Sequence, residues 1–419
     1  MLKKPLFIML MLLMLGTQAQ AEIDTANIYS NVEKSVYQIR VINKQTGKKS
    51  SIGSGFVVNK ADILATNYHV VSEYINDPDV FQLEYLATDG STGPLELIDF
   101  DIVHDLAVVK AEKSMGTPLK ISFLPKKGAS LYSLGNPMDL GFTIVKGSNN
   151  GILSKAEDGN ILFSGSLNPG MSGGPTLDED GNIIGINVAT SGNDISFLVP
   201  AEYLTIVLDR LKENNYKPVD DRFAHSAEQI TTNSKKLVNK MLNSKWSGTK
   251  IGKLIVPAEL DKSLRCWDAS RTPKKDDLFR TYFTRCSNED NIFISSRLNV
   301  GTINYEYMWL ETEKLSPTRF YRRYEKVNSS VIGSRAGKRD VTNFSCHTDF
   351  TNIASQEFKT TVCRRDYLKY EGLSDMLFTT AMVGKGDRGF LFNLDFTGTD
   401  SKAALALFTR MLETFKWQK

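Results

Sequence analysis

A glycine-rich segment around one serine is the part of the sequence best suited to covalent chemistry. It reads Asn168-Pro169-Gly170-Met171-Ser172-Gly173-Gly174-Pro175. Glycines on both sides of a serine let the backbone turn sharply, present the hydroxyl and aim its own N–H groups at one point. Ser172 is therefore the candidate nucleophile.

A serine hydroxyl is unreactive unless a base removes its proton and a third group holds that base. The chain has 4 histidines. His69 follows a strand-like run and precedes an apolar pair, so its ring would sit at a strand end facing a cleft, whereas the other three are flanked by polar residues. Asp105 leads directly into an apolar strand-like run. The chain order His69, Asp105, Ser172 favours a catalytic histidine over a structural one.

The segment also matches Gly-x-Ser-x-Gly, the nucleophile elbow of α/β-hydrolases. That elbow needs a strand-to-helix turn, with the acid and the histidine after the serine in the chain. Gly173-Gly174-Pro175 disfavours the first turns of a helix, and His69 precedes Ser172. The esterase alternative is therefore the weaker one.

Short strands must position these residues. Between residues 28 and 212, β-prone runs are divided by separators with turn chemistry, such as Glu-Asp-Gly-Asn, and no long helix intervenes. The pattern predicts a barrel or sandwich, closed by an amphipathic helix over residues 201–211. The expected strands are Val36–Val41, Ser54–Val58, Ile63–Ala65, Phe81–Tyr85, Leu106–Lys110, Ser130–Leu134, Thr143–Lys146, Gly151–Ser154, Ile161–Ser164, Ile183–Val188 and Ile195–Val199.

The remainder of the chain differs in composition. Residues 213–245 are polar and turn-rich, with a polar helix over 224–242 that has few apolar anchors, and they predict a helical linker. Residues 246–419 predict an α+β accessory domain that ends in an amphipathic helix over 401–417. Its expected strands are Ile292–Leu298, Tyr305–Leu310, Phe358–Arg364, Met376–Val383 and Gly389–Asp395.

Five motifs in order resemble the trypsin-like serine proteases, and most closely the HtrA/Deg-type bacterial branch. They are Gly53-Ser54-Gly55-Phe56-Val57-Val58, Ala65-Thr66-Asn67-Tyr68-His69-Val70-Val71, His104-Asp105-Leu106-Ala107-Val108-Val109, the segment around Ser172, and Gly185-Ile186-Asn187. The likeness covers about residues 28–212 and implies an all-β, chymotrypsin-like double β-barrel with the active site between the barrels. It also implies peptide-bond hydrolysis without a cofactor or metal.

The resemblance assigns a role to each candidate. Ser172 would be the nucleophile, His69 the general base and then acid, and Asp105 the carboxylate that orients the imidazole. The amides of Gly170 and Ser172 would form the oxyanion hole. Asp99 and Asp101 are alternatives for the acid, but neither abuts the apolar strand that could bury it. His104 is expected to be solvated, because neighbours on an extended chain point in opposite directions.

The resemblance also places a substrate pocket. Ser166 would form its base, and Gly185, Ile186 and Asn187 would form its wall. None of these is charged, so we expect small or medium apolar side chains at the residue before the cleaved bond, since a cation would lose its water without gaining a partner.

Two departures from the family pattern stand out. Met171 occupies a place where relatives usually have Asn or Asp, so a hydrogen bond that holds the oxyanion loop would be missing. The segment after Trp246 lacks a recognisable peptide-binding loop, whereas HtrA-type relatives usually carry a PDZ domain. The alternative function is therefore a catalytically silent binding protein that keeps the protease scaffold.

The cysteines all lie in the C-terminal half. Two local disulfides are predicted, Cys266 with Cys286 and Cys346 with Cys363, because short loops close at the lowest entropy cost, although 4 cysteines allow other pairings. A zinc site is the competing interpretation. No Cys-x-x-Cys pair exists, and His347 would point away from its neighbour Cys346 along a strand.

The first residues predict export. Lys3 and Lys4 precede an apolar run, and Ala19-Gln20-Ala21 fits a cleavage site, so residues 1–21 are expected to be a signal peptide and residues 22–212 the protease domain. An uncleaved anchor is the alternative, but the apolar run of about ten residues is short for a membrane span. The expected location is periplasmic or secreted.

Charge and partners complete the sequence-based expectations. The 51 basic and 48 acidic residues nearly balance, which disfavours nucleic-acid binding. A basic cluster in the C-terminal part is ordinarily a solvated face, with an acidic partner or an anionic envelope surface as the alternative. It comprises Arg319, Arg322, Arg323, Lys326, Arg335, Lys338 and Arg339. The expected partner of the catalytic site is a polypeptide substrate, and the oligomeric state is left open.

Overall fold

The structure, a computed structural model, describes residues 25–153, 159–190, 195–272, 274–288, 291–328 and 332–418. The N-terminal half folds into two closed six-stranded antiparallel barrels, with strand orders β1-β2-β3-β6-β5-β4 and β10-β11-β12-β9-β8-β7. This confirms the expected double barrel. The first contains β1 (Val36–Asn43), β2 (Lys49–Val57), β3 (Ile63–Thr66), β4 (Phe81–Leu86), β5 (Thr92–Asp101) and β6 (Leu106–Ala111). The second contains β7 (Ser130–Gly135), β8 (Thr143–Ile152), β9 (Ile161–Phe163), β10 (Pro175–Leu177), β11 (Ile183–Thr190) and β12 (Ser196–Pro200).

Two barrel strands were missed by the sequence patterns, and two expected strands are one. The missed strand β5 contains Gly93 and Pro94, and the missed strand β10 is 3 residues long and begins at Pro175. Glycine and proline weaken a strand signal, although both occur at strand starts and edges. The expected strands 143–146 and 151–154 form the single strand β8, which ends at Ile152; residue 154 lies outside the described residues.

Helices pack against the two barrels. The predicted helix at 201–211 is α3 (Ala201–Glu213), whose Leu204, Val207 and Leu211 are buried. Together with α1 (Thr25–Val32), it packs on an apolar cluster shared by the two barrels, which contains Phe56 of β2 and Leu134 of β7. The helix α2 (Tyr68–Asn76) follows β3 and carries His69. Two short 3-10 helices are η1 (Glu33–Ser35) and η2 (Pro137–Asp139).

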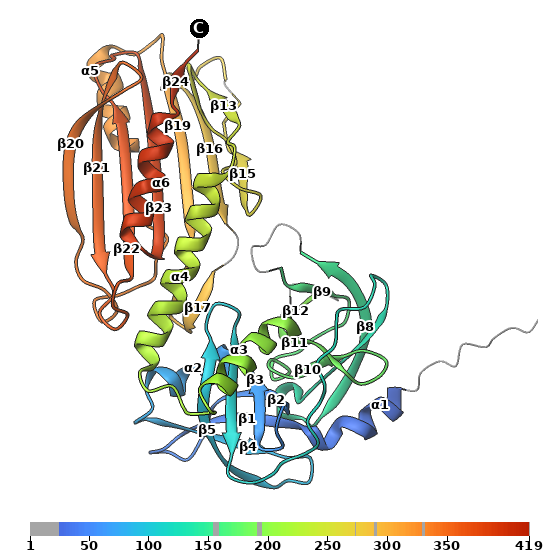
Figure 1. Ribbon diagram of the computed structural model, residues 1–419. Coiled ribbons are helices and arrows are strands. Elements are labelled where there is room, and N and C mark those ends of the chain that lie inside the picture. The colour runs from blue at the N-terminus through green and yellow to red at the C-terminus, as the bar shows by residue number, and fades with distance from the viewer. Residues whose placement is uncertain are drawn as a thin grey trace, which may run out of the picture.

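The C-terminal half is built on an open seven-stranded antiparallel sheet of order β15-β16-β19-β23-β22-β21-β20 (Figure 1). Its strands are β15 (Leu264–Asp268), β16 (Arg280–Asn288), β19 (Ile303–Glu311), β20 (Ser345–Ile353), β21 (Gln356–Asp366), β22 (Ser374–Met382) and β23 (Arg388–Thr399). A small sheet of β13 (Gly248–Ile251), β14 (Leu254–Pro257) and β24 (Lys416–Trp417) and a hairpin of β17 (Ile292–Ser295) and β18 (Leu298–Val300) accompany it.

Helices cover both faces of this sheet. The helices α4 (Arg222–Asn243) and α6 (Ser401–Glu413) pack on one face in a cluster that contains Trp309, and α5 (Pro317–Val327) packs on the other face against Leu310. Trp309 and Leu310 are neighbours on β19 and are buried on opposite faces of the sheet, as expected for a strand covered on both sides.

Two expectations for this half require correction. The run 292–298 was expected to be one strand, but it forms the β17–β18 hairpin, because the chain turns after Ser295. The helix α4 was expected to be a polar linker with few anchors. Instead, Ala227 and Ile230 join the core cluster of the first barrel, and Leu237, Val238 and Met241 join that of the seven-stranded sheet.

Both disulfides are present with the local pairing. Cys266 on β15 is bonded to Cys286 on β16, and Cys346 on β20 is bonded to Cys363 on β21. Each pair consists of direct cross-strand neighbours, with a Cα–Cα distance of 4.0 Å.

The helices were considered as possible membrane spans. Within the ranges that the structure describes, no helix has both the length and the apolar character needed to cross a bilayer. The predicted signal peptide, residues 1–21, lies outside the described residues.

Candidate active site

His69 and Asp105 form a hydrogen-bonded pair at one end of the first barrel. His69 is the second residue of α2, and its Nδ1 lies 2.7 Å from Oδ2 of Asp105. The backbone N–H of His69 donates to the other oxygen, Oδ1, at 2.8 Å. A carboxylate only accepts, so Nδ1 carries the shared proton and Nε2 is left as the basic nitrogen.

Asp105 has a φ of 56°, a backbone conformation that residues other than glycine seldom adopt. Its carbonyl accepts hydrogen bonds from the side chain of Asn67 at 2.8 Å and from the backbone of Tyr68 at 3.1 Å. Positive φ at a residue other than glycine stores strain and clusters at functional sites. The strained turn directs the Asp105 carboxylate back to the start of α2.

The pair changes the acidity of the imidazole. Burial lowers the pKa of His69, whereas the charge of Asp105 and its hydrogen bond raise it, and the balance lies above the ordinary value of 6.5. The arrangement therefore stabilises the imidazolium that forms when His69 accepts a proton.

The neighbouring acids are engaged elsewhere. Asp101 Oδ2 lies 2.6 Å from Nδ1 of His104, whose ring stacks on Tyr203 at a centroid distance of 3.8 Å. The expectation that His104 is solvated is therefore wrong: its side chain is only 17% exposed, because this acid and this ring enclose it. Asp101 is buried as well, so the reason given for excluding it was also incorrect.

Asp99 is buried beneath α3 and α4. It accepts two hydrogen bonds from Arg210, at 2.8 and 2.9 Å, and lies 3.0 Å from His225 Nε2. Burial raises the pKa of Asp99, but the hydrogen bonds from His225 and Arg210 and their charges bring it below its ordinary value. The contacts of Asp99 and Asp101 leave Asp105 as the carboxylate that meets His69.

The Ser172 segment forms a tight loop rather than a helix. Gly170 and Gly173 have φ of 97° and 83°. A Cβ on Gly170 would lie 2.5 Å from the Asn136 carbonyl oxygen, and one on Gly173 would lie 2.3 Å from that of Ser54. Strand β10 begins directly at Pro175, which contradicts the strand-to-helix turn of the esterase alternative.

Ser54 and Asn187 brace this loop from two sides. From the first barrel, Ser54 donates its hydroxyl to the Gly170 carbonyl at 2.7 Å and its backbone N–H to that of Ser172 at 2.7 Å. From β11, Asn187 donates its side-chain amide to the Met171 carbonyl at 3.1 Å and to that of Leu134 at 2.9 Å. Both bracing side chains are fully buried, so the loop is held by both barrels.

Met171 anchors the loop through apolar packing. Its side chain is 1% exposed and packs in the core cluster of the second barrel with Leu131, Phe163 and Leu198. Apolar burial and the Asn187 hydrogen bond therefore act on the same residue of the loop.

The hydroxyl of Ser172 has a hydrogen-bond partner in the loop's surroundings, whereas, in the part of the chain that the structure describes, two backbone amides of the loop do not. Ser172 Oγ donates to the Val188 carbonyl at 2.9 Å. Among the described residues, the amides of Gly170 and Ser172 donate to no protein acceptor, so both are available to an incoming oxyanion. Attack by Ser172 would require its hydroxyl to turn from Val188 toward Nε2 of His69.

The expected pocket residues are divided between the surface and the core. Ser166 is exposed, whereas Gly185 is buried. Ile186 and Asn187 are fully buried, Ile186 in the cluster shared by the two barrels and Asn187 in the hydrogen bonds to the loop, so both side chains are enclosed by the protein. The sequence patterns missed Val188, whose carbonyl faces the nucleophile.

Comparison with known proteins finds relatives for the part of the chain that carries these residues. Residues 53–186 match the family model of the trypsin-like peptidase domain. Over 176 residues the chain is 30% identical to Protease Do-like 1, chloroplastic, of Arabidopsis thaliana, covering 38% of this chain and 39% of that protein. Over 178 residues it is 31% identical to Serine protease HTRA2, mitochondrial, of Drosophila pseudoobscura pseudoobscura, covering 40% and 41%. The predicted resemblance to HtrA/Deg-type trypsin-like proteases is confirmed for this part of the chain.

The solved crystal structure of Deg5 is also similar, with 26% identity, a TM-score of 0.39, and coverage of 44% of this chain and 92% of that chain. The chain spans about two fifths of the length of the curated relatives it matches. The family model and the curated relatives concern this part of the chain and support a serine protease.

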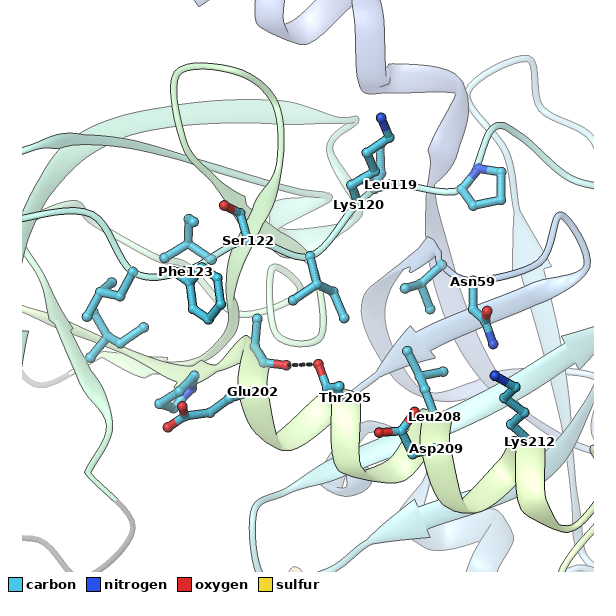
Figure 2. A pocket seen from close by; sticks show the side chains of 18 of the residues that line it. Asn59, Leu119, Lys120, Ser122, Phe123, Glu202, Thr205, Leu208, Asp209 and Lys212 are labelled. Carbon is cyan, nitrogen blue, oxygen red and sulfur yellow. Dashed lines mark hydrogen bonds between the residues drawn. The ribbon is translucent and has the colours of Figure 1, made fainter.

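A pocket of about 860 Å³ lies on the N-terminal half beside α3 (Figure 2). Its lining includes the exposed Phe123, with Leu208 and Lys212 of α3. His69, Asp105 and Ser172 do not line it. This pocket is therefore separate from the candidate catalytic side chains.

Proposed function

We propose that the protein is a serine endopeptidase that hydrolyses peptide bonds through an acyl-enzyme. The observation that carries the proposal is the pairing of His69 with Asp105, together with a braced Ser172 loop whose two amides are available. His69 would take the Ser172 proton as Oγ attacks the carbonyl carbon, and then return it to the leaving amine. Gly170 and Ser172 would donate to the oxyanion, where one such donor contributes roughly 10²- to 10³-fold in turnover.

The substrate preference is part of the proposal. A small or medium apolar side chain before the cleaved bond suits a pocket bounded by Ser166, because an arginine or lysine there would be desolvated without a carboxylate partner. A peptide library tests this. Cleavage after valine should exceed cleavage after arginine, and equal rates would contradict the preference.

We also propose the division of the chain and its location. Residues 1–21 would be a signal peptide, 22–212 the protease domain, 213–245 a helical connection and 246–419 an α+β accessory domain. The protein would act in the periplasm or outside the cell. The two disulfides support an oxidising compartment, since such bonds persist there.

Labelling of the active serine tests the activity. The purified protein and a Ser172→Ala control are treated with a fluorophosphonate at neutral pH, and any adduct is located by mass spectrometry. A single adduct on Ser172, absent from the control, is the expected result. A folded, disulfide-bonded protein that takes no label at Ser172 would refute the proposal.

The second candidate is a catalytically silent binding protein on the same scaffold. The observation in its favour is that Ser172 Oγ donates to Val188, with Met171 in place of the usual polar residue. This candidate predicts no labelling even when peptide substrates bind. Measuring peptide binding to the Ser172→Ala variant and turnover by the wild type separates the two.

The basic cluster on and after α5 supports a further partner proposal. All seven side chains, including Arg322 and Arg323, are exposed, whereas Phe320 and Tyr324 of the same helix face the sheet. Attraction to an acidic partner would be reduced by Arg322→Glu combined with Arg323→Glu. Heparin retention that survives both changes would show that this cluster is not the binding surface.

A further inference from the structure

The β17–β18 hairpin of the C-terminal half lies against the helix that carries His69. In Figure 1 the hairpin reaches from the end of the sheet toward α2. The hydroxyl of Tyr68 and the side-chain amide of Asn76, at the two ends of α2, both donate to the Ile294 carbonyl at 3.2 Å. The hairpin is therefore bonded to the first and the last residue of this helix.

Apolar packing secures the same contact. Ile292, Ile294, Leu298 and Val300 belong to one buried cluster with residues of the first barrel, including Val71 of α2. A hairpin joined to the barrel in this way shares its rigidity, because close-packed interiors resist displacement.

Two further hydrogen bonds involve the base of the hairpin and the end of α2. The side chain of Asn288 donates to the Gly301 carbonyl at 2.9 Å and closes the base of the hairpin. Tyr370, from the loop after β21, donates to the side-chain oxygen of Asn76 at 3.0 Å. The end of α2 is thus held by two separate segments of the C-terminal half.

Phe293 brings the hairpin to the imidazole itself. Its ring centroid lies 6.1 Å from that of His69, and the two rings meet at 78°. Residues alternate along a strand, so while Ile292 and Ile294 enter the cluster, Phe293 is half-buried beside the histidine. Edge-on contact at this separation is a favourable aromatic geometry.

We propose that Phe293 is a positioning residue that acts through His69. His69 and Asp105 side chains are 29% and 20% exposed, so water and outward rotation of the ring compete with their hydrogen bond. The Phe293 ring occupies the space beside the imidazole and opposes both. This inference rests on the proposed peptidase function, and it makes the C-terminal half a contributor to the geometry of the active site.

Kinetics of three variants test the inference. Phe293→Ala should lower kcat about tenfold with little change in KM, because the base is misplaced while peptide binding is retained. Phe293→Leu keeps apolar bulk and should recover most of the loss. The matched control is Phe350→Ala, which removes the same ring from an exposed position on β20. Equal kcat for Phe293→Ala and wild type, or equal losses in Phe293→Ala and Phe350→Ala, would overturn the proposal.

A readout that needs no turnover separates this inference from the proposed function. The Nδ1 proton shared by His69 and Asp105 is followed by proton NMR, with thermal unfolding as the control for folding. Its exchange with water should be faster in Phe293→Ala than in wild type or Phe293→Leu. If wild type fails to cleave peptides but the exchange still accelerates, the peptidase proposal fails and the positioning role stands. Unchanged exchange rejects the positioning role.

Discussion

The two halves of the molecule solve the problem of sheet edges differently. Each barrel of the N-terminal half closes on itself, whereas the C-terminal sheet is open and ends in β15 and β20. Each disulfide joins one of these edge strands to its inner neighbour, and the N-terminal half contains no cysteine. An edge strand is held by one partner only, so a covalent link adds most there. The disulfides thus hold the open sheet, while closure holds the barrels that carry the candidate site.

The largest expected effect is a loss of turnover caused by one change in the N-terminal half. Asp105→Asn keeps the shape of the side chain but favours the wrong imidazole tautomer, and it should lower kcat about 10⁴-fold. Stability of the C-terminal sheet should not change. Turnover and urea unfolding of the same preparation check both points, and a mild loss of turnover would argue against Asp105 as the acid.

Removing one of the edge-strand disulfides should lower stability and leave the candidate site intact. Cys346→Ser combined with Cys363→Ser opens a link between residues 17 apart and should reduce the free energy of unfolding by about 3 kcal/mol. Urea unfolding measures this loss, with Cys266→Ser plus Cys286→Ser as the comparison at the other edge. Fluorophosphonate labelling of Ser172 in the folded protein should persist. Loss of labelling without unfolding would show that the sheet edge, and not only the hairpin, supports the site.

The pH dependence should separate the two causes that act on His69. The neutral imidazole is the base, so the rate of Ser172 labelling should rise with pH, with a midpoint above 6.5 because Asp105 raises the pKa of His69. In Asp105→Asn the remaining influence of burial lowers that pKa, so the midpoint should move down. A midpoint that does not respond to this change would mean that another group controls the profile.

The smallest effects concern the loop residue that departs from the family. Met171→Leu preserves apolar volume and should change stability by less than about 1.5 kcal/mol with normal labelling. Met171→Asn places an amide in the apolar cluster and should cost about 1–3 kcal/mol. Thermal unfolding and labelling measure both. Faster labelling in Met171→Asn would indicate that the apolar anchor holds the loop in a less reactive arrangement.

The candidate site was predictable where its residues lie in contiguous motifs. The strand after Asp105, the turn around Ser172 and the helix after Pro200 each have a local pattern, and these elements have the expected form. Strands β5 and β10 were missed because glycine and proline interrupt their patterns. The burial of Asp99, Asp101 and His104 was missed because it depends on pairing with residues of other elements, including Tyr203 and Arg210.

Features that depend on short-range interactions could be predicted from the sequence, whereas features that depend on long-range contacts could not. Alternation, turn residues and glycines act over a few neighbours, so the amino-acid order was enough to predict most barrel strands, the sharp turn at Ser172 and the local cysteine pairs. Only the tertiary structure shows how Ser54 and Asn187 brace the loop. It also shows that α4 belongs to two cores and that Phe293 contacts His69. Those contacts join residues far apart in the chain, and their geometry exists only after strands pair and helices pack.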